Sequence, residues 1–146
     1  MRFRFNLETV LQLRIQEQRQ AQRFLSEAIE ATDIIENRIK QNEQERQTIR
    51  SAMNPVIGSV QIQNLLAGGR YELQIQVRIM ELKKQQEQLQ QEVERRRELL
   101  KDVDIRLKQI EKLRENALQR HREEQQQMEQ RELDELAVVR HFRRGF

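Results

Sequence analysis

The chain has 146 residues, of which 35% are charged, 36% apolar and 4% aromatic, and its formal net charge at pH 7 is +3. So few apolar residues cannot enclose a compact core, and one proline with four glycines favours long solvated helices. Because there is no cysteine, disulfides and thiolate metal sites are excluded. No window approaches 18 apolar residues, and the N-terminus lacks the apolar core of a secretion signal. We therefore expect a soluble, cytoplasmic protein.

The first predicted helix follows a basic arm, residues 2–5, in which two arginines alternate with two phenylalanines. Asn6 is of a type that caps helices. Alternating steps of four and three residues from Leu7 then meet apolar side chains at nine of fourteen positions. The positions are Leu7, Leu11, Arg14, Gln18, Ala21, Leu25, Ala28, Thr32, Ile35, Ile39, Asn42, Arg46, Ile49 and Met53. A mean step of 3.5 residues predicts a coiled-coil helix over 7–53, which ends before Pro55 because proline disfavours helical geometry at the preceding residue.

A connection at 54–69 contains the proline and three of the four glycines. It predicts a turn with a short helix over Val60–Ala67, capped by Ser59 and followed by Gly68 as the left-handed C-terminal residue. The second predicted helix covers about 70–142, and residues 71–142 contain neither proline nor glycine. The same walk from Ile75 meets thirteen apolar residues among twenty, which favours a coiled coil over disorder. The positions of this series from residue 75 to residue 110 are Ile75, Ile79, Leu82, Gln86, Leu89, Val93, Arg96, Leu100, Val103, Leu107 and Ile110.

The predicted fold is all-α: one coiled-coil domain over 1–146, formed by a long two-helix antiparallel hairpin. Setting Met53 opposite Tyr71 makes the numbers of facing residues add up to roughly 124, so the C-terminal helix is expected to overhang beyond about residue 122. The overhang carries apolar residues, which indicates either a partner protein or a frayed, self-associating tail. On the seam, Asn42 is interpreted as fixing register, and Arg96 as a long side chain that reaches water.

The sequence offers little for catalysis or for cofactor binding. No phosphate-binding glycine loop occurs, and His121 and His141 lie twenty residues apart, too far to share a metal on one helical face. Two basic clusters, at 94–98 and 140–144, are short, and acids are interleaved through most of the helix. We expect a protein that is not an enzyme, has no cofactor or metal and does not bind nucleic acid.

Two terminal segments are the most specific features: Asn6-Leu7-Glu8-Thr9-Val10-Leu11-Gln12-Leu13-Arg14 and Leu133-Asp134-Glu135-Leu136-Ala137. With the chain length and the predicted hairpin, they resemble the flagellar FliJ family along essentially the whole chain. The resemblance implies a cytoplasmic part of the flagellar type III export apparatus, at the cytoplasmic face of the inner membrane. It also implies a fold like the two-helix stalk of the F1 ATPase gamma subunit.

The resemblance further implies three partners: the hexameric flagellar export ATPase, the cytoplasmic domain of the export gate, and export substrate chaperones. As a stalk and adaptor, the chain is expected to promote assembly and activity of the ATPase ring and to link it to the gate. The implied ATPase-binding residues are Leu7, Leu11, Leu133, Asp134, Glu135, Leu136 and Arg140. The implied gate-binding residues, near the turn, are Asn42, Glu45, Ile49, Tyr71 and Ile75. Two alternatives remain: a free helical chaperone without an ATPase partner, and a homo-oligomeric structural coiled coil.

Overall fold

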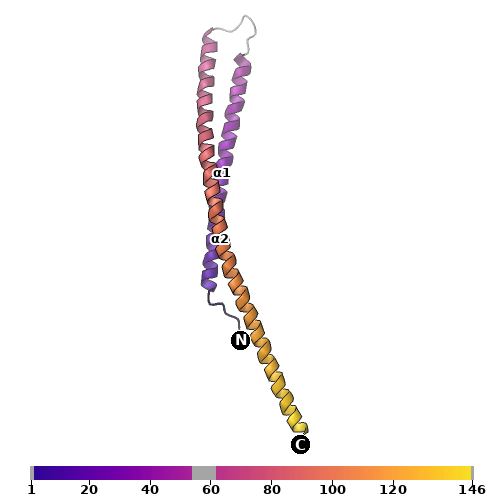
Figure 1. Cartoon of the computed structure of the whole chain (residues 1–146). Helices are drawn as coiled ribbons and strands as arrows, with labels where there is room; N and C mark the ends of the chain where they lie inside the picture. Colours follow the sequence, from indigo (N-terminus) through magenta and orange to yellow (C-terminus); the bar gives the residue numbers. More distant parts are fainter. Residues whose placement is uncertain (1, 54–61, 146) are drawn as a thin grey trace. The chain divides into compact units, whose positions relative to one another are not determined.

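The computed structural model describes residues 2–53 and 62–145, which form two helices. Helix α1 covers Glu8–Met53 and helix α2 covers Ile62–Arg144 (Figure 1). No strand occurs within these two ranges. The predicted all-α fold class is confirmed.

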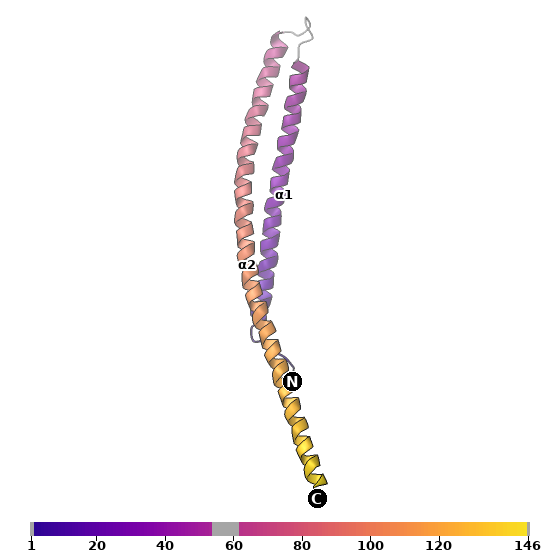
Figure 2. The same cartoon turned by 45° about the vertical axis from the view of Figure 1, so that its right-hand side comes forward.

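The contacts within the chain group into two compact units. Unit 1 comprises Met1–Arg19 and Asp102–Phe146, and unit 2 comprises Gln20–Lys101. In unit 2, the α1 and α2 portions lie side by side in both cartoon views (Figures 1 and 2). In unit 1, the start of α1 contacts α2 through an ion pair between Glu8 and Arg114. The two helices therefore pack against each other as a helical hairpin, as predicted.

A narrow apolar seam holds each unit together, and it follows the predicted stripe. Every buried apolar residue that the structure describes falls on a position of the four-and-three walk. Unit 1 buries Leu11, Val103 and Leu107; unit 2 buries Ala21, Ala28, Ile35, Ile39, Ile75, Ile79 and Val93. Full burial of one such branched side chain contributes about 1.5–3 kcal/mol. The coiled-coil period of the sequence thus determines which face of each helix is buried.

Polar contacts between the helices define an antiparallel register. Glu8 pairs with Arg114, Gln18 with Asp104 and Arg50 with Glu72, so the two residue numbers of each pair add up to 122. This is close to the predicted value of roughly 124. Gln18 Nε2 donates to Asp104 Oδ1 at 2.7 Å, which links the two helices within unit 1.

The ends of α1 lie within one residue of the predicted boundaries, whereas α2 begins about eight residues earlier than predicted. The Leu11 N–H donates to the Leu7 carbonyl at 2.9 Å, which makes Leu7 rather than Asn6 the N-cap of α1. Helix α2 begins at Ile62, earlier than residue 70, and Gly68 and Gly69 lie inside it. Glycine is unfavourable in a helix but keeps its backbone N–H, so the helix continues through the pair. The remainder of the predicted turn, 54–61, lies outside the described residues.

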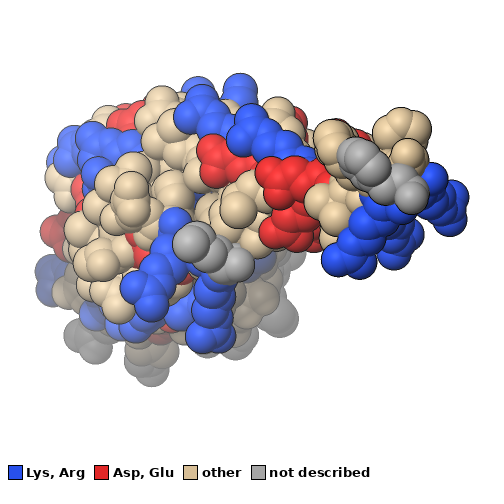
Figure 3. Space-filling model, turned by 90° about the horizontal axis from the view of Figure 1, so that it is seen from below, with Lys and Arg blue, Asp and Glu red and all other residues tan. Residues whose placement is uncertain are grey.

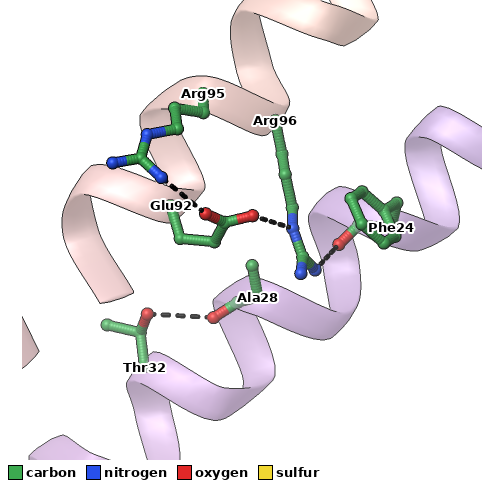
Figure 4. A network of polar contacts seen from close by, with 6 residues as sticks. All are labelled: Phe24, Ala28, Thr32, Glu92, Arg95 and Arg96. Atoms are coloured by element: carbon green, nitrogen blue, oxygen red, sulfur yellow. Dashed lines mark hydrogen bonds and ion pairs between the residues drawn. The ribbon is translucent and has the colours of Figure 1, made fainter. Parts of the chain in front are cut away.

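The polar residues on the seam behave differently from the interpretation made from the sequence. Arg96 does not simply extend to water: its guanidinium lies over the Phe24 ring, and Nη1 donates to the Phe24 carbonyl at 2.5 Å (Figure 4). Its Nε also donates to Glu92 Oε1 at 2.9 Å. Asn42 Nδ2 donates to the Arg38 carbonyl at 2.7 Å, within its own helix. Among the described contacts, Arg96 therefore connects the two helices and Asn42 does not.

Candidate protein-interaction surfaces

The end of α2 presents an exposed apolar segment, which we call the C-terminal segment and define as residues 128–142. Every side chain in it is exposed. Its large apolar residues are Met128, Leu133, Leu136, Val138, Val139 and Phe142, with exposed fractions between 48% and 64%. Shallow grooves cross its surface, and one of them is lined by Leu133, Leu136, Ala137 and Arg140 together with His141 and Arg144. This segment has the exposed apolar surface that binding to another protein requires.

The apolar residues of the C-terminal segment surround the helix rather than forming one stripe. At about 100° of rotation per residue, Leu136 and Val138 lie about 160° apart, on nearly opposite sides. Leu133 lies about 60° from Leu136, and Phe142 lies about 40° from Val138. A second groove, lined by Val138, Val139, Phe142 and Arg143, lies on the side away from Leu133. Charged residues such as Asp134 and Arg140 lie between these apolar side chains, so the segment offers apolar surface on several sides without being apolar all round.

The predicted polar residues of this surface are exposed as well. Asp134 accepts a hydrogen bond from Gln130 Nε2 at 3.1 Å, one turn earlier on the same helix. Glu135 helps to line a groove with Leu136 and Val139, and Arg140 lies beside Leu136 in the groove described above. The five α2 residues of the predicted ATPase-binding set are thus brought together on one exposed stretch of helix.

The two α1 residues of the same set lie elsewhere in unit 1. Leu11 is buried in the seam with an exposed fraction of 7%, whereas Leu7 is 39% exposed at the helix start. Next to Leu7, Glu8 Oε2 pairs with Arg114 Nε at 3.5 Å. Leu133 is nineteen residues beyond Arg114 on α2, roughly 28 Å along a helix. The structure therefore does not bring Leu7 and Leu11 together with the C-terminal segment, and Leu11 is placed to support the seam.

The basic arm packs against α2 instead of extending freely. The Phe3 ring lies 5.5 Å from the His121 ring, centroid to centroid, with an interplanar angle of 53°. The Arg114 guanidinium lies 5.9 Å from the Phe3 ring centroid. Tilted aromatic pairs and cation–π contacts of this kind are each worth about 0.5–1.5 kcal/mol. These contacts attach the arm to α2 beside the first turn of α1.

The predicted gate-binding residues lie together in unit 2, around a set of polar contacts between the helices. The Tyr71 hydroxyl donates to Glu45, and this hydrogen bond to a carboxylate raises the pKa of Tyr71 above 10.0. Glu72 accepts from Arg50 and, at 3.5 Å, from Arg46. The hydrogen bond from Arg50 is the largest cause of a lowered pKa of Glu72. Tyr71 itself has an exposed fraction of 39%.

The remaining members of the set differ widely in exposure. Asn42 and Ile49 are half-buried on α1, and Ile75 is fully buried, with an exposed fraction of 0%. A side chain with no exposed surface cannot contact a partner unless the helices separate. In the structure Ile75 forms part of the seam that supports the neighbouring surface.

An exposed apolar stripe that the sequence reasoning missed runs along α2 opposite the seam. We call it the outer stripe; it consists of Leu66, Leu73, Val77 and Met80, which are 58%, 61%, 55% and 63% exposed. At about 100° per residue these four side chains fall within an arc of about 60°, on the side of the helix away from Ile75 and Ile79. The signal was present in the sequence: the 73, 77, 80 series has the same four-and-three spacing as the seam, displaced by two residues.

Other kinds of site find no support in the described part of the chain. Within it, no group of three or more His, Cys, Asp or Glu side chains could hold a metal ion. On the face shown in Figure 3, Lys and Arg side chains form several separate groups with acidic and uncharged residues between them. Of the helices in the described ranges, none has a stretch long and apolar enough to span a membrane.

Comparison with known proteins identifies a protein family. A family model described as flagellar FliJ protein matches residues 3–146 of the chain. Neither the comparison with curated proteins nor that with solved structures found a match. The family match covers the seam, the outer stripe and the C-terminal segment alike.

Proposed function

The chain belongs to the FliJ family and is thereby a component of the flagellar export apparatus, and within that apparatus we propose that it acts as a non-enzymatic central stalk and adaptor. The C-terminal segment enters the ring of the hexameric export ATPase and promotes ring assembly and activity. The part of the hairpin that carries Tyr71 and the outer stripe contacts the export gate. The chain also associates with export substrate chaperones, at the cytoplasmic face of the inner membrane.

The distribution of apolar residues around the C-terminal segment carries this proposal. A single partner helix covers one stripe of its neighbour, with contacts at i, i+3, i+4 and i+7. Leu136 and Val138 face opposite directions, so one partner helix would leave one of them in water. A ring of subunits surrounds a helix and covers both. The segment therefore fits the inside of a ring better than it fits a groove.

The charges on the segment supply the asymmetry that a coupling shaft needs. At about 100° per residue, Asp134, Glu135 and Arg140 point in three directions that are about 100° or more apart. The subunits of a ring thus meet different charges on different sides of the helix. A shaft can bias subunit states only through contacts that differ between those states. The buried seam supports this role because it packs α1 against α2 within each unit.

The exposed fractions of the side chains favour a gate-binding surface that differs from the predicted set of residues. Tyr71 and Glu45 are accessible, and the outer stripe provides 55–63% exposed apolar side chains on the same helix as Tyr71. Tyr71 is of a residue type that often anchors protein interfaces, and the exposed apolar side chains beside it offer surface that a partner can bury, whereas the buried Ile75 serves as packing beneath them. We assign the gate contact to the outer stripe together with Tyr71, with Asn42, Glu45 and Ile49 on the adjacent helix.

The experiment that tests the stalk function is ATP hydrolysis by the purified export ATPase at increasing molar ratios of this chain. We expect stimulation that saturates near one chain per six ATPase subunits. The triple variant Leu133→Ala, Asp134→Ala, Glu135→Ala should not stimulate, although its circular dichroism stays helical because all three side chains are exposed. A matched control, Arg97→Lys on exposed surface of unit 2, should stimulate like wild type.

Other outcomes identify the alternative functions. No stimulation at any ratio by a helical chain rejects the stalk. A free chaperone would instead bind several client proteins without the ATPase, and a structural coiled coil would form a dimer in small-angle scattering.

A further inference from the structure

Two adjacent glycines lie within α2, just before the first contacts with α1 that are found among the described residues. Gly68 and Gly69 lie within the helix, and the backbone of Gly69 is not in the left-handed region that favours glycine. A Cβ atom built on Gly69 meets nothing within 4 Å. Neither backbone geometry nor close packing requires glycine at this position. What glycine contributes here is a lower helix stability, since it loses more backbone entropy on ordering than alanine does.

The part of α2 before the glycines makes few contacts with α1 among the described residues. From Asn64 to Ala67 every side chain is exposed, including Leu65 at 37% and Leu66 at 58%. None of the hydrogen bonds or ion pairs found among the described residues joins 64–69 to α1. Local stability in a protein follows buried apolar contacts and protected hydrogen bonds, so this stretch lies at the low end.

The helix immediately after the glycines is attached firmly to α1. Tyr71 donates to Glu45, Glu72 pairs with Arg46 and Arg50, and Ile75 is fully buried. Among the described residues, the hydrogen bonds between α2 and α1 therefore begin within two residues after Gly69.

We propose that Gly68–Gly69 is a hinge in α2, at which the first turns of the helix open and close as a unit while the helix from Tyr71 onward stays packed. Leu66 belongs to the movable side of the hinge, and Leu73, Val77 and Met80 belong to the fixed side. Opening therefore detaches one end of the outer stripe from the rest and lets Leu65 and Leu66 reorient. The consequence for docking rests on the proposed gate contact; the hinge itself does not.

Hydrogen–deuterium exchange of the full-length chain, without any partner, tests the hinge. We expect a step in protection between Gly69 and Ile75, with amides 65–69 exchanging at least about tenfold faster than amides 76–82. Gly69→Ala should slow exchange at 65–69 by about fivefold, the effect of the helix propensity difference on the opening equilibrium. Ala67→Gly should speed exchange there by a similar factor. Neither variant should alter amides 76–82.

Two results would overturn the hinge. One is a smooth gradient of exchange from residue 65 to 82, which is ordinary fraying of a helix end. The other is an unchanged rate at 65–69 in Gly69→Ala. Gly145→Ala, at the far end of α2, is the control for a general effect of the substitution. Because no partner is present, failure here leaves the gate contact to be judged separately, by binding of the purified gate domain to a Leu73→Ser variant.

Discussion

The guanidinium of Arg96 lies 3.6 Å from the centroid of the Phe24 ring, on the opposite helix of unit 2. The same side chain donates to the Phe24 carbonyl and to Glu92, so its charge is partnered although the side chain is only 19% exposed. A long cation thereby fills a seam position that an aliphatic residue normally occupies. Figure 4 shows the arginine reaching from α2 across to α1.

Arg96→Ala should lower the free energy of unfolding by about 2 kcal/mol, because it removes a cation–π contact and a charge-assisted hydrogen bond together. Urea unfolding followed by circular dichroism measures the change. Arg97→Ala is the matched control: Arg97 is 59% exposed and lies 3.8 Å from Glu94, so its loss should cost less than about 0.5 kcal/mol. Equal losses for the two variants would mean that Arg96 contributes no more than a surface arginine.

Ile75 and Leu73 provide a test of the two faces of α2. Ile75→Ala should destabilise the hairpin by about 2–5 kcal/mol, because it leaves a cavity in the seam. Leu73→Ala, at a side chain that is 61% exposed, should change stability by less than about 0.5 kcal/mol. Binding to the purified gate domain should show the reverse order once Ile75→Ala is measured under conditions where it is folded. Loss of gate binding only in Ile75→Ala would contradict the assignment of the contact to the outer stripe.

The pKa of Glu72 predicts how the stability of unit 2 depends on pH. Its pKa is lowered in the folded state, first by the hydrogen bond from Arg50, so the ionised carboxylate favours folding. That stability is present above the unfolded-state pKa, near 4.5, and is lost as the pH falls through the folded-state pKa. The melting temperature of Glu72→Gln should be lower than that of wild type at pH 7, and the difference should shrink in acid. A constant difference from pH 7 to pH 2 would show that the carboxylate charge is not involved.

The pKa of Tyr71 is shifted in the opposite direction to that of Glu72, so it predicts a loss of stability at alkaline pH. Its pKa is raised, first by its hydrogen bond to Glu45, so the protonated phenol favours folding. This contribution is present below pH 10.0 and is lost as the pH rises through the higher folded-state value. Wild type should therefore lose stability relative to Tyr71→Phe above pH 10. The melting temperatures of both proteins between pH 8 and 11 measure this, and parallel curves would contradict it.

Leu136 and Val138 distinguish enclosure by a ring from binding to a single helix. Leu136→Ser and Val138→Ser each remove an exposed side chain from opposite sides of α2, and neither should alter hairpin stability by more than about 0.5 kcal/mol. If a ring surrounds the C-terminal segment, both variants should reduce ATPase stimulation, each by about tenfold in the concentration required. A defect in only one of them would indicate a partner that covers a single side.

The two long helices and the seam between them could be predicted from the amino-acid sequence. The four-and-three spacing of apolar residues is a geometric property of the helix, so it identified Ile35, Ile79 and Val103 as buried without knowledge of the partner helix. The ends of α1, and the register of the pairs Glu8–Arg114 and Arg50–Glu72, followed closely from the same pattern and from Pro55, whereas α2 begins at Ile62 instead of at about residue 70.

Which apolar and polar side chains remain available for binding depends on how the two helices pack. Leu73 and Ile75 are both apolar and two residues apart, and packing against α1 buries one and leaves the other exposed. Arg96 was interpreted as a residue reaching water, because its partner Phe24 is 72 residues away in the sequence. Helical periodicity depends on neighbours a few residues apart, whereas these outcomes depend on which residues of the opposite helix lie across the seam.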